Sequence, residues 1–539
     1  MPDRPRATAT PPGSRPARPY IVRGIVTGLL AAAVALGVSQ LAAGITGPVG
    51  SPVVSVGQSV IGLTPRPVTD FVIKIFGPHD KPVLLITIVV LLALFAAAFG
   101  IAAMRRPAAG FAGLAIFAVI GLVAVATRPN SAPVDVVPTL AGAGVGAWAL
   151  ARLARAAGAG AAGAGDTGAA DTGAADPRAG DAPSYGRRSF IAASTVAAAG
   201  AAASGVVGNL LSQRSTVTQS RALVRLPPPV TRLPPLAGRT DLHIPGLSPF
   251  VTPNGSFYRV DTALFIPQVA PGSWRLRVHG MVTRELDITF AELLRRPLTE
   301  ADITLCCVSN PVGGPYIGNA RWLGVSLASV LREAGVKPGA DQLLSTSTDG
   351  YTSGTPVATV MDGRNALLAV AMNGAPLPVA HGFPARMIVP GLYGYVSATK
   401  WVTDINVTTF AAEQGYWVQQ GWTQRGPIKT QSRIDVPNGT SPLKAGHIVV
   451  AGVAWAQHRG VAAVEVRVDG GAWQEARLAT VPGIDTWRQW VWDWDAAAGS
   501  HQLEVRATDA TGYTQTGAQA NIFPDGATGW HSVQVTVSA

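Results

Sequence analysis

The stretch DITLCCVSN at residues 302–310 bears most strongly on the fold of this chain. Apolar and polar side chains alternate along its first half, and a two-residue alternation is typical of a β-strand. Pro311, Gly313 and Gly314 follow closely, so we expect a strand near 302–308 that ends in a loop. On such a strand the neighbours Cys306 and Cys307 point to opposite sides.

Cys306 and Cys307 are the only cysteines in the sequence, and a disulfide between sequence neighbours would be strained. At least one thiol is therefore expected to be free. A thiolate is a soft ligand that suits the softer transition metals, and a cysteine at the end of a strand can present its sulfur to a pocket. The other interpretation is a small buried hydrophobic residue, because free cysteine is among the most buried residue types. We expect this packing role for Cys306.

The surroundings of these cysteines resemble the sulfite oxidase family of molybdopterin enzymes. That family has a strand ending Thr-Leu-x-Cys-x-x-Asn, and the matching residues here are Thr304, Leu305, Cys307 and Asn310. Further motifs match in order along residues 257–435: FYR at 257–259, AMNG at 371–374, HGFPARMIVPG at 381–391 and KW at 400–401. The combination favours the metal-ligand interpretation of Cys307.

The resemblance implies a cofactor in which molybdenum is held by a pterin dithiolene and by the thiolate of Cys307. The residues that it implies as contacts of the pterin, its phosphate or the site are Arg259, Asn310, His381, Arg386 and Lys400. Cationic groups suit this role because they form charge-assisted hydrogen bonds with phosphate and pterin acceptors. Tyr351 aligns with the active-site tyrosine of the family, which implies a hydrogen bond to a metal oxo group or to the substrate. Tyr351 and Arg259 are the candidate catalytic residues.

Several of these residues have a plainer alternative. Arg386 and Lys400 could be surface charges, and His381 could be a structural histidine whose hydrogen bonds are satisfied. Tyr351 lies in a loop rich in glycine and threonine, where it could simply pack against a turn.

Two departures from the family pattern bear on the substrate. Asp261 stands where sulfite-oxidising members have histidine, and Val312 stands where they have arginine. The missing arginine removes a positive charge from the expected anion pocket, and Arg321 is the nearby candidate to replace it. The resemblance implies oxygen-atom transfer, with a small sulfur oxyanion such as sulfite as the first candidate substrate. The alternatives are reduction of a sulfoxide or N-oxide and, in another class, a non-catalytic membrane-tethered binding or assembly protein.

The composition indicates that part of the chain lies in a lipid bilayer. Hydrophobic residues make up 48% of the sequence and charged residues only 14%, against about 25% charged residues in an average soluble domain. The net charge is +11, and most of the excess lies in the first 214 residues, which contain no glutamate. These cations flank apolar runs, so we do not expect nucleic acid as a partner.

Five apolar runs are long enough to be transmembrane helices, because crossing a bilayer takes about 20 helical residues. They cover residues 25–45, 83–104, 108–126, 134–150 and 190–211. A further run at 53–63 is too short to span. Arginines precede the first run, separate the second from the third, follow the fourth and precede the fifth, which places these segments in the cytoplasm. Since five is odd, everything after residue 211 is expected outside the cytoplasmic membrane.

The segment GRRSFIA at 186–192 resembles a twin-arginine export signal. That pathway carries folded proteins, which suits a cofactor inserted in the cytoplasm. Ordinary cytoplasmic arginines are the alternative. The five runs contain no histidine and the chain has no Cys-x-x-Cys-His motif, so we expect no haem. Electrons would then pass to an external electron carrier or a membrane redox partner.

The predicted fold class is therefore multi-domain. The expected order is a four-helix membrane block (1–156), a flexible Gly/Ala/Asp-rich linker (157–186), a fifth transmembrane helix (187–212), a proline-rich spacer (213–240), an α+β molybdopterin domain (241–438) and a C-terminal β domain (439–539). The last has about 100 residues of short alternating strands and turns, which is typical of an immunoglobulin-like sandwich. It resembles the dimerisation domain of the same family, so a homodimer is a possible assembly.

Overall fold

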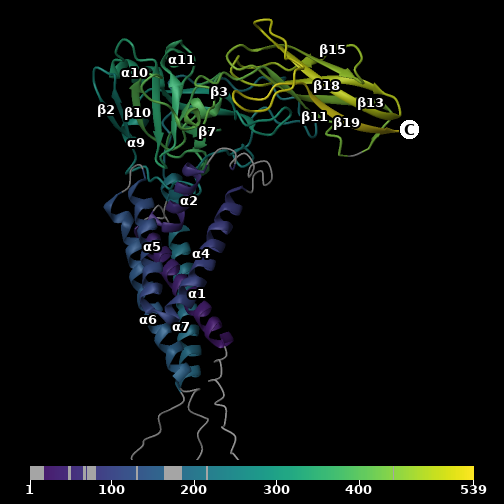
Figure 1. Cartoon of the computed structure of the whole chain (residues 1–539). Helices are drawn as coiled ribbons and strands as arrows, with labels where there is room; N and C mark the ends of the chain where they lie inside the picture. Colours follow the sequence, from purple (N-terminus) through teal and green to yellow (C-terminus); the bar gives the residue numbers. More distant parts are fainter. Residues whose placement is uncertain are drawn as a thin grey trace, which may run out of the picture. The chain divides into compact units, whose positions relative to one another are not determined.

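The computed structural model of the chain describes residues 17–46, 50–64, 68, 80–128, 132–162, 185–213, 217–440 and 442–539. The chain divides into two compact units, Met1–Ser215 and Thr216–Ala539. The first unit is helical, and the second contains all the strands that Figure 1 labels.

The helical unit consists of α1 (Ala17–Thr46), α2 (Pro52–Leu63), α4 (Asp80–Arg105), α5 (Pro107–Ala126), the short 3-10 helix η3 (Pro133–Val136), α6 (Val137–Ala162) and α7 (Tyr185–Gln213). Among the described residues, five helical segments of 20 to 27 residues are long and apolar enough to span a membrane. They include the five apolar runs of the sequence. Helix α2 has 12 residues and is too short to span, as expected.

Glycines allow these helices to approach closely. A Cβ at Gly37 of α1 would lie 2.6 Å from the carbonyl oxygen of Ala201 in α7, and one at Gly28 would overlap Ala96 of α4. Small residues at the contacts are the usual way for helices to pack where lipid removes the hydrophobic driving force. The contact pairs show that α7 runs parallel to α1, whereas α4 and α6 run antiparallel to it.

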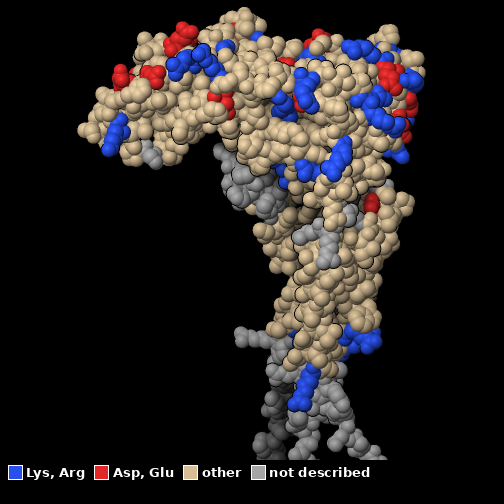
Figure 2. All heavy atoms as spheres, turned by 180° about the vertical axis from the view of Figure 1, so that it is seen from behind, with Lys and Arg blue, Asp and Glu red and all other residues tan. Residues whose placement is uncertain are grey.

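This arrangement brings the cytoplasmic arginines predicted from the sequence to one end of the helical unit. Arg23 near the start of α1 donates to the carbonyl oxygen of Ala157 near the end of α6 at 3.2 Å. The guanidinium of Arg105, at the end of α4, lies 5.9 Å from the ring of Tyr20 in α1. Figure 2 shows Lys and Arg gathered at this end. The chain leaves α7 at the other end, where α1 also finishes.

The linker expected at 157–186 is shorter than predicted. Helix α6 continues to Ala162 and α7 begins at Tyr185. Residues 163–184 lie outside the described residues.

The first part of the second unit is an α+β domain with two sheets. One sheet has the order β2-β1-β10-β5-β6, and the other has the order β3-β4-β7-β8 with β9 paired to β7. The strands are β1 (Arg275–Gly280), β2 (Leu286–Thr289), β3 (Leu298–Cys306), β4 (Ile317–Ser326), β5 (Gln342–Ser347), β6 (Thr352–Pro356), β7 (Leu367–Met372), β8 (Ala375–Pro376), β9 (Arg386–Ile388) and β10 (Val402–Thr408). The helices of this part are α9 (Phe290–Arg295), α10 (Leu327–Ala334), α11 (Val357–Met361) and α12 (Tyr416–Gln419).

The proline-rich segment predicted as a spacer at 213–240 makes hydrogen bonds with the α+β domain over its described part from residue 217. It opens with α8 (Val217–Ala222), and beyond it the amide of Val230 donates to the carbonyl oxygen of Leu298 at 2.9 Å. The amide of Leu233 donates to the carboxylate of Glu300 at 2.8 Å. The physical reason is that β3 lies at the edge of its sheet, where its backbone groups need partners. Residues 217–240 therefore pack with the α+β domain.

The last part of the chain is two packed sheets. One has the order β11-β13-β17-β16, and the other has the order β12-β19-β18-β14-β15. The strands are β11 (Gln431–Val436), β12 (Leu443–Lys444), β13 (Gly446–Trp455), β14 (Val461–Val468), β15 (Gln474–Glu475), β16 (Arg477–Leu478), β17 (Arg488–Ala496), β18 (Gly499–Asp509) and β19 (His531–Ser538). Alternate side chains such as Val464, Val466, Leu503 and Val505 fill the core between them. Because β11 pairs with β13, the sandwich begins near 431, earlier than the expected 439.

Candidate functional site

Cys307 is the first residue after β3, where the chain turns away from the sheet. Its amide donates to the carbonyl oxygen of Tyr316 at 2.9 Å, and its carbonyl oxygen accepts from the amide of Asn310 at 3.0 Å. The side-chain oxygen of Asn310 in turn accepts from the amide of Tyr316 at 2.7 Å. The Cys-x-x-Asn spacing therefore builds a fixed turn. The Cys307 thiol lines a cavity, whereas Cys306 is only 2% exposed and packs in the core, as expected.

The lining of the cavity beside Cys307 includes two groups of side chains that bear on its chemistry. The cationic group contains His381, Arg386 and Lys400 together with Asp261, and the aromatic group contains Tyr351, Tyr395, Trp417 and Trp422. Cys307 borders both groups, because its thiol interacts electrostatically with Lys400 in one and with Tyr351 in the other. Burial raises the pKa of the Cys307 thiol.

Burial dominates the electrostatics of the cationic group. It lowers the pKa of His381 to about 4, with Arg386 and Lys400 adding repulsion, so the imidazole is neutral at pH 7. Burial also lowers the pKa of Arg386 to about 10 and that of Lys400 to about 8, although Asp261 opposes the second shift. These cations lack most of their hydration, which is energetically unfavourable unless an anion or strong acceptor compensates.

Three buried polar atoms near the cavity have no hydrogen-bond partner within the described parts of the chain. They are the side-chain amide nitrogen of Asn310, the hydroxyl oxygen of Ser347 and the Nε of Arg386. A buried donor without a partner costs about 1–3 kcal/mol, so native proteins usually satisfy such groups. Donors and desolvated cations around one thiol therefore fit a ligand rich in acceptors, such as a pterin with its phosphate.

The structure brings most of the predicted site residues together. Cys307, Tyr351, His381, Arg386 and Lys400 line the cavity, and Asn310 is next to Ser309, which also lines it. Arg386 is 5% exposed and the Lys400 side chain 11%, so the surface-charge alternative fails for both.

Arg259 occupies a different position. Its guanidinium forms a two-point ion pair with Asp261 at 2.7 and 3.2 Å, and its side chain is 36% exposed. Asp261 also accepts from Lys400 at 2.8 Å and so joins the two cations. Arg259 is not on the cavity wall, which removes the geometric support for its predicted catalytic role. A contact with the cofactor at the rim stays a prediction.

The sequence prediction missed most of the aromatic group. Tyr395, Trp417 and Trp422 line the cavity with Tyr351, which was the only aromatic residue assigned to the site. The stretch YWVQQGW at 416–422 is unusually rich in aromatic residues and was the available signal.

The β-sandwich holds the strand that carries Cys307. The amide of Thr304 donates to the carbonyl oxygen of Asp485 at 2.9 Å, and the amide of Trp487 donates to the Thr304 hydroxyl at 2.7 Å. The side-chain amide of Gln457 donates to the Thr304 carbonyl oxygen at 3.2 Å. These contacts satisfy the outer edge of β3 three residues before Cys307.

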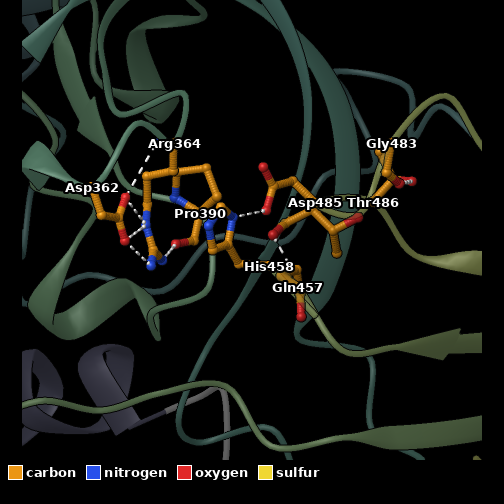
Figure 3. A network of polar contacts seen from close by, with 9 residues as sticks. Asp362, Arg364, Pro390, Gln457, His458, Gly483, Asp485 and Thr486 are labelled. Carbon is orange, nitrogen blue, oxygen red and sulfur yellow. Dashed lines mark hydrogen bonds and ion pairs between the residues drawn. The ribbon is translucent and has the colours of Figure 1, made fainter. Parts of the chain in front are cut away.

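A polar network continues along this junction between the α+β domain and the sandwich (Figure 3). His458 pairs with Asp485 at 3.1 Å, and Arg364 pairs with Asp362 at 2.6 Å and donates to the carbonyl oxygen of Pro390. A separate cavity of about 560 Å³ lies here and shares no lining residue with the one at Cys307. Two of the arginines that line it, Arg364 and Arg459, pair with Asp362 and Asp509. We assign the catalytic role to the smaller cavity, which contains Cys307.

Known proteins resemble this chain over the same region. Residues 263–417 match the family described as oxidoreductase molybdopterin binding domain. Sulfite oxidase of Gallus gallus is 32% identical over 328 residues, which cover 51% of this chain and 70% of the chicken protein. The mitochondrial sulfite oxidase of Homo sapiens is 29% identical over 356 residues, which cover 54% of this chain but only 62% of the human protein. The crystal structure of the sulfane dehydrogenase SoxCD from Paracoccus pantotrophus matches 54% of this chain and 84% of its own, with 25% identity and a TM-score of 0.48.

The likeness to the chicken protein extends far beyond the Cys307 motif. The matched family segment contains Cys307, Tyr351, His381, Arg386 and Lys400. This chain therefore belongs to the sulfite oxidase family of molybdopterin-dependent oxidoreductases.

Proposed function

We propose that this chain is a membrane-anchored, extracytoplasmic oxidoreductase that transfers an oxygen atom at a molybdenum–pterin centre beside Cys307. The observation that carries the proposal is the cavity itself. The Cys307 thiol lies there beside the buried cations Arg386 and Lys400 and near hydrogen-bond donors that have no partner among the described residues. The bound cofactor supplies two-electron oxygen-atom transfer, and the protein supplies binding, orientation and electrostatics.

In this proposal the cationic group holds the cofactor. Arg386 and Lys400 offer desolvated positive charge to the phosphate, and the Nε of Arg386 and the amide nitrogen of Asn310 offer donors that have no other partner among the described residues. His381 is neutral and can donate or accept without adding charge. Asp261 limits the net positive charge and fixes Lys400 in place.

Tyr351 is the candidate for orienting the substrate. Its hydroxyl donates to the carbonyl oxygen of Tyr395 at 2.9 Å. Burial raises the pKa of Tyr351, and the proximity of Cys307 raises it further, so the phenol keeps its proton at neutral pH. Tyr351 is therefore a protonated phenol and not a base, and it would donate to a substrate by turning its hydroxyl away from the Tyr395 carbonyl oxygen.

The helical unit supports a membrane anchor with a cytoplasmic N-terminus. Arg23 and Arg105 lie at one end of the five long helices, Arg128 follows α5 at the other end, and the chain continues from that other end. Under the positive-inside rule this leaves the second unit outside the cytoplasm. The twin-arginine motif at the start of α7 would then serve export of the folded, cofactor-loaded domain.

We further propose that the domains follow the predicted order with revised limits. The α+β domain starts near 217 and the sandwich starts near 431. Two packed sheets with a shared core fit an immunoglobulin-like sandwich, and this domain is the candidate surface for a homodimer. Electrons would be exchanged with an external carrier or a membrane redox partner.

A sulfoxide or N-oxide reductase is the second candidate. It is favoured by the position of Arg321, whose guanidinium pairs with Asp302 at 2.8 and 2.9 Å and does not line the cavity, so it does not replace the missing arginine. The non-catalytic alternative is disfavoured, because the family to which the chain belongs consists of enzymes.

Metal and pterin analysis of the purified full-length chain tests the proposal. We expect about one molybdenum per chain, with a clear loss in the double variant Arg386→Gln/Lys400→Gln. Arg467→Gln/Arg506→Gln on the sandwich is the matched control, because those two arginines lie over Trp473 far from Cys307 in the fold. Wild-type protein without molybdenum, produced in cells that make the cofactor, would contradict the proposal.

A further inference from the structure

We propose that the cavity of about 560 Å³ at the junction between the α+β domain and the sandwich is a binding site for an organic anion with an apolar body. This site is separate from the cavity at Cys307, and the inference does not depend on the proposed function. It follows from the charge of the lining, from the way in which its arginines are held and from the apolar residues beside them.

Positive charge from three separate segments of the chain converges on this cavity. Its lining includes Arg364, Arg425 and Arg459, and the one carboxylate among the described lining residues is Asp341. Asp341 is exposed, and its carboxylate already accepts from the amide of Phe410 at 2.8 Å. Three guanidinium groups and one carboxylate leave the lining with an excess of two positive charges, which favours an anionic ligand.

Two of these guanidinium groups are held in place by carboxylates that do not line the cavity. Arg364 pairs with Asp362 at 2.6 Å and donates to the carbonyl oxygen of Pro390 (Figure 3). Arg459 pairs with Asp509 at 2.9 Å. A guanidinium has five N–H donors, so these bonds leave donors for a ligand on side chains whose positions are already fixed. Fixed donors lose less conformational entropy when a ligand binds.

Arg425 differs from the other two arginines of the lining. It is exposed, and it has no hydrogen bond or ion pair with any residue that the structure describes. Its loop is nevertheless anchored, because the amide of Ile428 donates to the carbonyl oxygen of Gly391 at 2.9 Å and the amide of Tyr393 donates to that of Gly426 at 2.8 Å. The whole guanidinium of Arg425 is therefore available to a ligand in the cavity.

The rest of the lining is largely apolar. It includes the buried residues Pro356, Val357, Leu392 and Phe410 together with Pro427. The cavity volume is within the range of small-molecule sites, about 300–1,000 Å³. An inorganic anion would leave this apolar surface in contact with water, whereas a ring or alkyl chain attached to the anionic group would cover it. The ligand is therefore an organic carboxylate or phosphate.

Calorimetry on the purified full-length protein in detergent tests the inference. The probes are phenyl phosphate and benzoate, with inorganic phosphate as the anion alone and benzyl alcohol as the ring alone. We expect phenyl phosphate or benzoate to bind at least about tenfold more tightly than either partial probe, because it combines the ionic and the apolar contacts. The tighter of the two organic anions distinguishes a phosphate ligand from a carboxylate.

Variants locate the binding site. Arg425→Gln should weaken binding of the organic anion by about tenfold, because hydrogen bonds from a charged group are lost. Ala358→Trp adds a large ring at an exposed position of the lining and should remove binding. Arg477→Gln on β16 is the matched control, because Arg477 is also exposed but lines neither cavity. Thermal unfolding without ligand checks that each variant is folded.

Three results would overturn the inference. The first is equal affinity for the organic anions and for inorganic phosphate. The second is binding that persists unchanged in both Arg425→Gln and Ala358→Trp, which would mean a site elsewhere. The third is the absence of binding heat and of any ligand-induced rise in Tm with all four probes. The molybdenum content of the same protein bears on the proposed function alone.

Discussion

Cys306 and Cys307 are neighbours in the sequence, but one thiol lies in the hydrophobic core and the other at the cavity. The alternation of side chains along β3 turns Cys306 into the core and leaves Cys307 at the cavity, as the sequence pattern predicts. The same pattern could not predict that Arg259 lies off the cavity wall. Its guanidinium pairs with Asp261, and the spacing of residues in the sequence does not predict this side-chain contact. The position of a side chain can therefore be predicted from the sequence where the alternation of the strand decides it. It is harder to predict where several ion-pair partners are within reach.

His531 provides a pH-dependent prediction at this scale. Its Nδ1 accepts from the amide of Ile434 at 3.0 Å, and burial lowers the pKa of the imidazole to about 4. The usual pKa of about 6.5 applies to the unfolded chain. Between these values the unfolded state binds more protons, so the free energy of unfolding falls as the pH drops from 6.5 to 4 and is unaffected above 6.5.

We expect this residue to lower stability by on the order of 2 kcal/mol at pH 5 relative to pH 7. Urea unfolding of the full-length protein, followed by tryptophan fluorescence, measures it. His531→Asn keeps an acceptor for Ile434 but cannot titrate, so its loss of stability between pH 7 and 5 should be smaller than that of the wild type. Equal losses in the two proteins would show that His531 is not the responsible group.

Among the elements, the position of β3 could be predicted from the sequence, but the partners of its outer edge could not. Its position, its end and its loop follow from local alternation and from Pro311, Gly313 and Gly314. Its outer edge is covered by residues 230–233 and 485–487, which lie far away in the sequence. Local composition predicted a proline-rich spacer for the first of these segments, because composition carries no information about which sheet edge needs a partner.

The contacts of Thr304 lead to a prediction for this element. Its hydroxyl accepts from the amide of Trp487 and donates to the side-chain oxygen of Asn319 at 3.0 Å. Thr304→Val leaves both groups buried without a partner, which should destabilise the second unit by about 1–3 kcal/mol. Thr304→Ser keeps the hydroxyl and should recover most of that loss. Denaturant titration measures both, and identical stability of the valine variant and the wild type would contradict the role of this clamp.

At the scale of the whole molecule, the five apolar runs and their arginines could be predicted because bilayer thickness and charge act on composition directly. The structure adds that the arginines of separate helices share one end of the helical unit. The aromatic side of the cavity was not predictable, since it is assembled from Tyr351, from Tyr395 in the 3-10 helix Gly394–Val396 and from the stretch 417–422, which are separated in the sequence.

Protease accessibility in cells with a sealed cytoplasmic membrane tests the membrane arrangement, and its outcome does not depend on which pathway exports the second unit. We expect a protease site inserted after residue 213 to be cut by protease added from outside, because this point follows the fifth span. A site inserted within 163–184 should be cut only after the membrane is broken. Protection of the site after residue 213 would mean an even number of spans and would contradict an extracytoplasmic second unit.

The central claim is that Cys307 is the protein's ligand to molybdenum, and X-ray absorption at the molybdenum edge tests it most directly. Wild-type protein and Cys306→Ser should show the same number of sulfur ligands, because Cys306 packs in the core. Cys307→Ser should retain the pterin, held by Arg386 and Lys400, and lose one sulfur ligand. Loss of a sulfur in Cys306→Ser, or an unchanged sulfur count in Cys307→Ser, would contradict the account.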